Sequence, residues 1–273
     1  MPPAARHSTV HALPEPDTRL LARPPLEVVI CEIRATSDLP ATLGSAEGLR
    51  LKDAAAAAGF PVQRIEQTQQ QGIRMQVGPG EQAAPLIETH SVGWQLISGD
   101  GSIMSVVPGV VSIQTTRYAS WEGSFRPLLA GALAAFDDVL QPQIRQRVGL
   151  RYVDRLVDPD ASSAGAWRGR VVDSLLGPVA DPRLGGRVVA SQQQTELAIS
   201  EHRHALLRHG PFADGALHGA ISYMLDIDAY DTTTTAFDVE GTLAAADELN
   251  QLALSLFQAT LSPAYLTELR GEE

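Results

Sequence analysis

Three consecutive strand-like segments joined by very short turns constrain the fold of this chain more than any other feature. Residues 94–98 (WQLIS) and 103–107 (IMSVV) flank an Asp100-Gly101 step, which is a strong signal for a tight hairpin turn. Pro108-Gly109 then leads into residues 110–117, in which apolar and polar residues alternate. Turns this short join antiparallel neighbours only, so the sequence predicts an antiparallel meander.

An amphipathic helix is predicted after this meander, over residues 124–139. The same order recurs later: strands predicted near 187–199, 202–208 and 220–230 precede a long helix over 239–261, with Asp238 as its N-cap. The apolar face of that helix comprises Leu243, Ala246, Leu249, Ala253, Leu256 and Phe257. Further predicted elements are strands at 26–35, 61–68, 73–77 and 148–157, and helices at 43–58 and after Ser262-Pro263.

This pattern predicts an α+β fold: a mainly antiparallel sheet in two meander-plus-helix halves, covered by a long C-terminal helix. The chain has 273 residues, a length that allows one large domain or two small ones. We expect a single domain, 24–273, whose halves span about 24–158 and 167–273. Residues 1–23 are rich in Pro, Ala and polar residues and are expected to be a flexible N-terminal tail.

Charge and hydropathy exclude several classes of partner. The formal net charge of −11 opposes binding to nucleic acids and to anionic membranes, and the arginines are scattered singly. No apolar run reaches the ~18–20 residues of a membrane span, and no secretory signal is visible, so we expect a cytoplasmic protein. The single cysteine, Cys31, lies in an apolar run and is expected to be a buried hydrophobic residue.

The chain resembles a sporadically distributed bacterial protein family of about this length, whose function is uncharacterised. The residues that carry the resemblance are Pro24–Glu27, Glu32–Arg34, Gly93–Ser98, Asp100-Gly101, Tyr118, Trp121, Phe125, Val148–Arg155, Leu225–Asp228, Phe257 and Leu261-Ser262. Many relatives carry Asn where this chain has Asp154. The resemblance implies a fold and a length, and no activity.

A first candidate site combines His202 and His204 with Asp226 and Asp228. Residues two apart on a strand point to the same face, so each pair projects together. The sequence His209-Gly210-Pro211 is typical of a turn. A hairpin whose midpoint lies near Asp214 would set His202 opposite Asp226. Such a cluster could hold Zn, Mn or Fe(II), whereas the alternative is a solvated sheet face. A register shift of one residue would destroy the site.

A second candidate site is a ligand-binding surface. Arg151 and Arg155 share one face of the predicted strand 148–157 and could bind a carboxylate or phosphate bidentately, whereas Tyr152 and Asp154 share the other face. An ion-pair network across the sheet is the alternative. The aromatic residues Trp94, Tyr118, Trp121 and Phe125 could line a ligand pocket or could be core. The predicted ligand-binding residues are Arg151, Tyr152, Arg155, Trp94, Tyr118 and Trp121.

No phosphate-binding loop, dinucleotide-binding motif, zinc-protease motif, nucleophile elbow or C-x-x-C motif occurs in the sequence. We therefore expect a non-enzymatic binding or accessory protein, without a cofactor, whose groove binds a small molecule, a peptide or a partner protein. The alternatives are a metal-dependent enzyme built on the His-x-His and Asp-x-Asp pairs, and an obligate structural subunit. The oligomeric state stays open, with a homodimer among the options.

Overall fold

The computed structural model describes residues 13, 15–36, 42–76, 84–158, 160–217 and 219–272, with the backbone alone for 70–76 and 84–91. Its centre is one antiparallel sheet with strand order β2-β3-β4-β5-β1-β6-β9-β8-β7, and β10 also pairs with β6. The strands are β1 (Leu26–Thr36), β2 (Val62–Gln76), β3 (Ala84–Ser98), β4 (Ile103–Val107), β5 (Val110–Thr115), β6 (Ile144–Leu156), β7 (Gln193–Ala198), β8 (Arg203–Ala213), β9 (Ile221–Asp231) and β10 (Thr235–Ala236).

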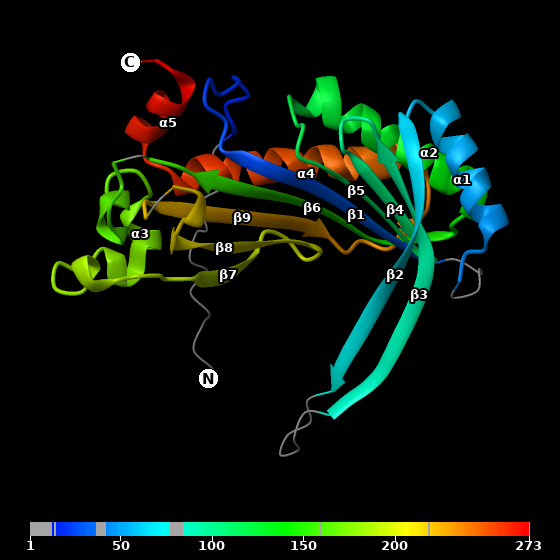
Figure 1. Ribbon diagram of the computed structural model, residues 1–273, viewed down its shortest axis with the longest axis horizontal. Coiled ribbons are helices and arrows are strands. Elements are labelled where there is room, and N and C mark those ends of the chain that lie inside the picture. The colour runs from blue at the N-terminus through cyan, green and yellow to red at the C-terminus, as the bar shows by residue number, and fades with distance from the viewer. Residues whose placement is uncertain are drawn as a thin grey trace, which may run out of the picture.

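The described helices pack on one face of this sheet or at its end (Figure 1). The α-helices are α1 (Ser45–Ala57), α2 (Arg126–Leu140), α3 (Asp173–Leu176), α4 (Val239–Thr260) and α5 (Pro263–Arg270). Short π or 3-10 turns lie at Trp121–Phe125, Ala164–Trp167, Gly177–Val179, Gly185–Arg187 and Gly215–Leu217. Helix α4 packs on β6 and β9, α2 packs on β5, and α1 packs on α2 and on the β2–β3 hairpin. We call this side the helix face and the opposite side the open face, because no described helix lies on it.

The predicted α+β architecture is confirmed, including the two meander-plus-helix halves and the long C-terminal helix. One difference lies in β2, which is a single strand where the sequence predicts two short ones. In the sequence, the polar tract Gln69-Gln70-Gln71-Gly72 suggests a break between two strands, because apolar and polar residues do not alternate in it. It pairs with β3 residue by residue nonetheless, because backbone hydrogen bonds do not depend on side-chain polarity.

The β2–β3 pair extends beyond the rest of the sheet, as Figure 1 shows, because β4 pairs with β3 over residues 94–97 only. Gly93 lies where β3 leaves β4. A Cβ atom at this position would lie 2.0 Å from the backbone oxygen of Val106, so the close approach of the two strands requires glycine.

We therefore expect Gly93→Ala to destabilise the protein by about 1–3 kcal/mol, because the backbone of β4 has to move away. Urea unfolding followed by circular dichroism would measure the change. Gly99→Ala is the matched control, since the nearest heavy atom to its Cβ would be 3.7 Å away. Equal midpoints for the two variants would show that β3 and β4 have room at Gly93.

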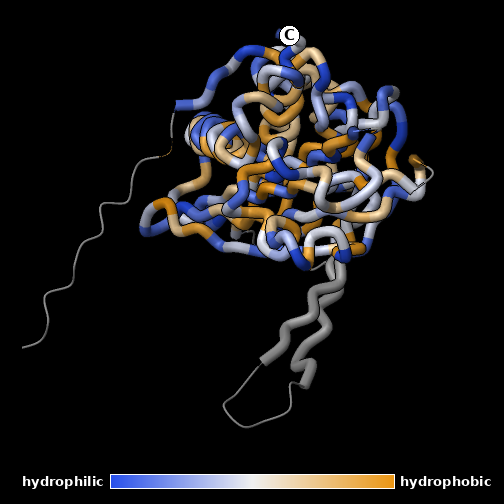
Figure 2. Tube along the Cα trace, turned by 90° about the vertical axis from the view of Figure 1, so that its left-hand side faces the viewer, coloured by the Kyte–Doolittle hydropathy of each residue, from blue (hydrophilic) through white to orange (hydrophobic). Residues whose placement is uncertain are grey.

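The core lies between the helix face and α2 and α4. The six residues predicted on the apolar face of α4 are all buried: Leu243, Ala246, Leu249, Ala253, Leu256 and Phe257. Asp238 caps α4 as predicted, because its side chain accepts a hydrogen bond from the Gly241 N–H at 2.8 Å. Hydrophobic stretches lie mainly inside the folded body (Figure 2). None of the described helices is long and apolar enough to cross a membrane.

The described part of the N-terminal segment is docked on the C-terminal helices, which differs from the flexible tail expected for residues 1–23. The Asp17 N–H donates to Gln258 Oε1 at 2.9 Å, and the Asp17 carboxylate lies 2.9 Å from the Arg270 guanidinium. The Arg23 N–H donates to the carbonyl of Leu269 at 3.0 Å. Composition alone does not reveal such long-range polar contacts. Residues 1–12 and 14 lie outside the described part of the chain.

Candidate functional site

The open face receives alternate side chains from the central strands β1, β6, β9 and β8. Arg151 and Arg155 of β6 lie on this face, while Tyr152 and Asp154 point to the helix face, as strand alternation predicts. The register aligns charged and apolar side chains in two adjacent rows across the strands. The rows are Val28–Val153–Asp226–Arg208 and Ile30–Arg151–Asp228–Leu206.

Asp226 connects two arginines at the centre of these rows. Arg151 donates to both of its carboxylate oxygens at 2.7 Å, in the bidentate geometry that fixes both groups. Arg208 donates to Oδ2 of the same carboxylate at 3.3 Å and to Gln194 at 3.2 Å. We call Arg151, Asp226 and Arg208 the arginine bridge. Two guanidinium groups and one carboxylate give it a net charge of +1.

Arg147 lies beside the arginine bridge and folds over Gly149. A Cβ atom at position 149 would lie 2.5 Å from Nη1 of Arg147, so the missing side chain makes room for the guanidinium. Arg147 lies 3.4 Å from the Glu32 carboxylate and 3.5 Å from that of Asp228. Burial raises the pKa of Asp228, and the arginines around it oppose that change.

An aromatic stack continues from Arg147 towards β8. The guanidinium carbon of Arg147 lies 4.8 Å from the ring centre of Tyr230, and the His204 ring stacks on Tyr230 at 5.3 Å. The Tyr230 hydroxyl donates to Glu196 at 2.5 Å on β7. The open face therefore offers a cation–π pair and an imidazole next to the arginine bridge.

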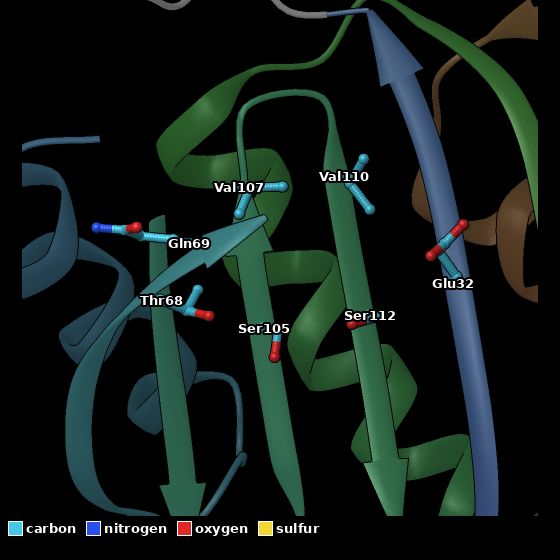
Figure 3. A pocket seen from close by; sticks show the side chains of 7 residues that line it. All are labelled: Glu32, Thr68, Gln69, Ser105, Val107, Val110 and Ser112. Atoms are coloured by element: carbon cyan, nitrogen blue, oxygen red, sulfur yellow. The ribbon is translucent and has the colours of Figure 1, made fainter. Parts of the chain in front are cut away.

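A shallow cavity of about 180 Å³ adjoins these residues, where the sheet curls towards β2 (Figure 3). Polar groups form much of its lining, and they come from four strands. The lining residues are Glu32, Thr68, Gln69, Ser105, Val107, Val110 and Ser112. The cavity is smaller than the ~300–1,000 Å³ typical of sites for drug-sized ligands.

The six predicted ligand-binding residues do not form one site. Arg151 belongs to the arginine bridge, whereas Arg155 binds Asp214 through Nε at 2.7 Å and lies 3.5 Å from Glu27. Hydrogen bonding by the Ser222 hydroxyl, and then by Arg155, lowers the pKa of Asp214 against the effect of its burial. Arg151 and Arg155 thus take part in ion pairs, which was the alternative to a ligand-binding role for these two residues.

The four aromatic residues of that prediction lie on the other side of the sheet or at its end. Trp94 donates from Nε1 to the carbonyls of Leu43 and Gly44 at 3.2 and 3.0 Å, which ties β3 to the start of α1. Trp121 donates to Asp247 of α4 at 2.7 Å and packs on Phe125. These tryptophans hold helices in place.

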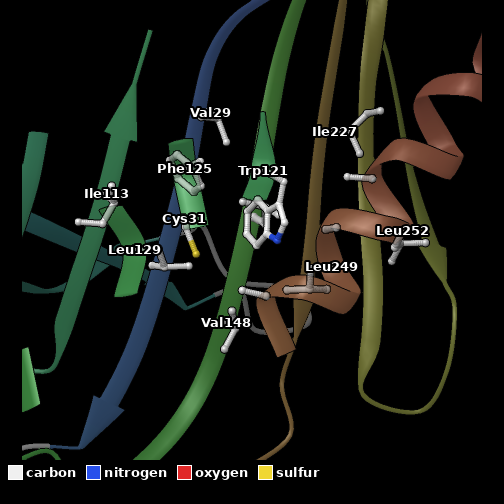
Figure 4. Packing of buried hydrophobic residues seen from close by; sticks show 14 of the residues in the cluster. Val29, Cys31, Ile113, Trp121, Phe125, Leu129, Val148, Ile227, Leu249 and Leu252 are labelled. Carbon is white, nitrogen blue, oxygen red and sulfur yellow. The ribbon is translucent and has the colours of Figure 1, made fainter. Parts of the chain in front are cut away.

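Tyr118 and Tyr152 pack edge to face with ring centres 5.8 Å apart, also on the helix face. The Tyr152 hydroxyl donates to Asn250 of α4 at 2.8 Å, and burial raises its pKa well above the usual range. Figure 4 shows Trp121 and Phe125 among buried side chains of β1, β6, β9 and α4. The aromatic cluster is therefore core, and the open face lacks these rings.

The predicted register between β8 and β9 is wrong, and the proposed metal ligands do not converge. His204 pairs with Tyr230, and Asp226 pairs with Arg208. His202 precedes β8, where its carbonyl accepts from the Thr232 N–H at 2.9 Å. Asp228 lies opposite Leu206. Among the described residues no group of three or more His, Cys, Asp or Glu side chains could hold a metal ion.

Two buried ionisable groups lie behind the open face. Cys31 is fully buried as expected, and burial raises the pKa of its thiol to about 12, which keeps it protonated and unreactive. Asp154 is 5% exposed. Burial, with a smaller contribution from Asp226, raises the pKa of Asp154 to about 8.

Sequence reasoning missed Arg147, Arg208 and Tyr230. A signal was present for Arg147, because it lies four residues before Arg151, and an even spacing places both on one strand face. Arg208 and Tyr230 carry no comparable signal, since their neighbours depend on the register between β8 and β9.

Comparisons with protein-family models, with curated proteins and with solved structures gave no match for this chain. The arrangement of the open face therefore carries the functional argument.

Proposed function

We propose that this chain is a non-enzymatic binding protein, and that the open face receives a segment of a partner protein. The observation that supports this proposal best is the one-sided cover of the sheet. Helices pack on one face, whereas the other combines fixed arginines with partly buried apolar residues. A sheet face of this kind offers a broad surface for a polypeptide.

The residue types on the open face agree with a protein interface. Interface centres are enriched in Arg, Tyr and Met and depleted in Lys, Glu and Asp. The open face follows this preference with Arg147, Arg151, Arg208, Tyr230 and Met224. Its acidic residues Glu32, Asp226 and Asp228 depart from the preference and lie there as ion-pair partners of the arginines. Ion pairs hold the arginines in place, so a partner would meet groups that have already lost rotamer freedom.

Site-specific photocrosslinking in the native host tests the proposal. Benzoylphenylalanine placed at Leu206 or Met224 of the open face should capture the same protein from both positions. Placed at Leu49, which is 58% exposed on α1, it should not capture that protein. The captured protein should then bind the purified full chain in calorimetry. Equal capture from Leu49, or no protein that rebinds, would overturn the proposal.

A further inference from the structure

We propose that the arginine bridge is a carboxylate-binding site, and that the partner segment on the open face presents an acidic side chain to Arg151 and Arg208. This inference rests on the proposed function and specifies the chemistry of the partner. The supporting geometry is the order of the charged groups from the sheet outwards: the Asp226 carboxylate lies next to the sheet, and the two guanidinium groups lie above it.

The exposure of the three side chains differs sharply. The Asp226 side chain is 3% exposed, whereas those of Arg151 and Arg208 are 41% and 33% exposed. Asp226 is thus covered by the arginines, and an incoming group meets guanidinium nitrogens first. Nη1 of Arg151 and Nη2 of Arg208 donate to no described residue, so each arginine keeps N–H groups for a ligand.

The buried carboxylate also prepares the arginines for binding. Arg151 is held by two bonds to Asp226, and Arg208 is held between Asp226 and Gln194. Their separation is therefore fixed before a ligand arrives, which reduces the entropy lost on binding. Asp226 balances one of the two positive charges. The neighbouring Asp228 carboxylate is shared between Arg151, Arg208 and Arg147, and an incoming carboxylate would add to it as a partner of the exposed guanidinium groups.

The surroundings favour a carboxylate on a polypeptide over a polyphosphate. The bridge has a net charge of +1 within a chain of net charge −11, so densely charged nucleic acids are repelled at longer range. Ile30, Val153 and Leu206 flank the bridge and are partly buried. Such neighbours suit a segment in which an acidic residue stands beside apolar side chains.

Titrating the full chain with a blocked hexaglutamate peptide, followed by NMR, tests the inference. Shifts should map to β6, β8 and β9, and hexaglutamine should cause none. Arg208→Gln should weaken hexaglutamate binding about tenfold, which corresponds to loss of a charged hydrogen-bonded contact. Arg208→Lys should restore only part of the affinity, because lysine lacks the planar fork.

Arg183→Gln is the control, because Arg183 is 87% exposed and pairs only with Asp181 among the described residues. If Arg208→Gln fails to fold, Arg151→Gln replaces it, since Arg208 still faces Asp226 in that variant. Equal affinity for hexaglutamate and hexaglutamine, or equal loss in Arg183→Gln, would overturn the carboxylate site. A hexathymidylate that binds more tightly than hexaglutamate would reassign the bridge to phosphate.

The two proposals fail in different ways. Photocrosslinking from Leu206 and Met224 that identifies a rebinding partner, together with no effect of Arg208→Gln on that partner, would remove the carboxylate site alone. Binding of hexaglutamate at the bridge without any partner crosslinked from the open face would leave an anion site and remove the proposed function.

Discussion

Trp167→Ala is expected to destabilise the protein by about 3–5 kcal/mol, a large part of the ~5–15 kcal/mol typical of a domain. Trp167 is fully buried, and its indole Nε1 donates to the carbonyl of Ile221 at 2.9 Å. Its ring packs on Tyr223 at 5.4 Å and on Tyr265 at 6.2 Å. One side chain thus joins the segment after β6 to β9 and α5, and its loss leaves a cavity and an unpaired carbonyl.

Urea unfolding monitored by circular dichroism measures this loss. Trp167→Phe keeps a ring in the site and removes the hydrogen bond, so it should cost less than the alanine variant. Leu184→Ala changes an exposed residue of the same segment and should unfold like the parent. A midpoint for Trp167→Ala equal to that of Leu184→Ala would show that the segment contributes little to the core.

The elements of this fold could be predicted from the sequence because their signals are local. The Asp100-Gly101 hairpin, the alternation in β1 and β6, and the apolar stripe of α4 each depend on residues close in the chain. The segment anchored by Trp167 lacks such a signal. Its first short helical turn, Ala164–Trp167, begins within the Ala- and Ser-rich stretch 160–166, and contacts with distant residues decide where the segment packs.

The candidate site depends on register, which the sequence specified poorly. His209-Gly210-Pro211 suggested a turn, but these residues lie inside β8, whose last residue is Ala213. Proline is tolerated there because the pairs between β7 and β8 end at His209, so no β7 residue needs an N–H from Pro211. Because β8 continues to Ala213 and β9 begins at Ile221, Asp226 pairs with Arg208 instead of His202.

Asp154→Asn is expected to remove most of a pH dependence that the parent protein shows between about pH 4 and pH 8. Unfolded aspartate has a pKa near 3.9. Burial, with a smaller contribution from Asp226, raises the pKa of Asp154 to about 8 in the folded protein. The folded state therefore holds this proton where the unfolded state has released it, and stability falls as pH rises through this range. Above the folded pKa the loss is complete and stays constant.

Each pH unit between the unfolded and the folded pKa lowers the free energy of unfolding by about 1.4 kcal/mol. The parent should therefore lose roughly 4 kcal/mol of stability between pH 4 and pH 7. Asparagine is neutral throughout, so the variant should lose the part of the pH dependence that Asp154 contributes and keep the part that Asp228 contributes, since burial also raises the pKa of Asp228. A buried amide costs about 1–3 kcal/mol at every pH if it lacks a partner. Because the parent loses stability as pH rises, the stability of the variant relative to the parent should be highest at pH 9 and lowest at pH 5. Asp138→Asn on the exposed side of α2 is the matched control and should follow the parent at every pH. If Asp154→Asn also followed the parent, the carboxylate would be ionised without cost in the folded protein. A solvent path or a hydrogen-bond donor would then have to reach Asp154 behind the arginine bridge.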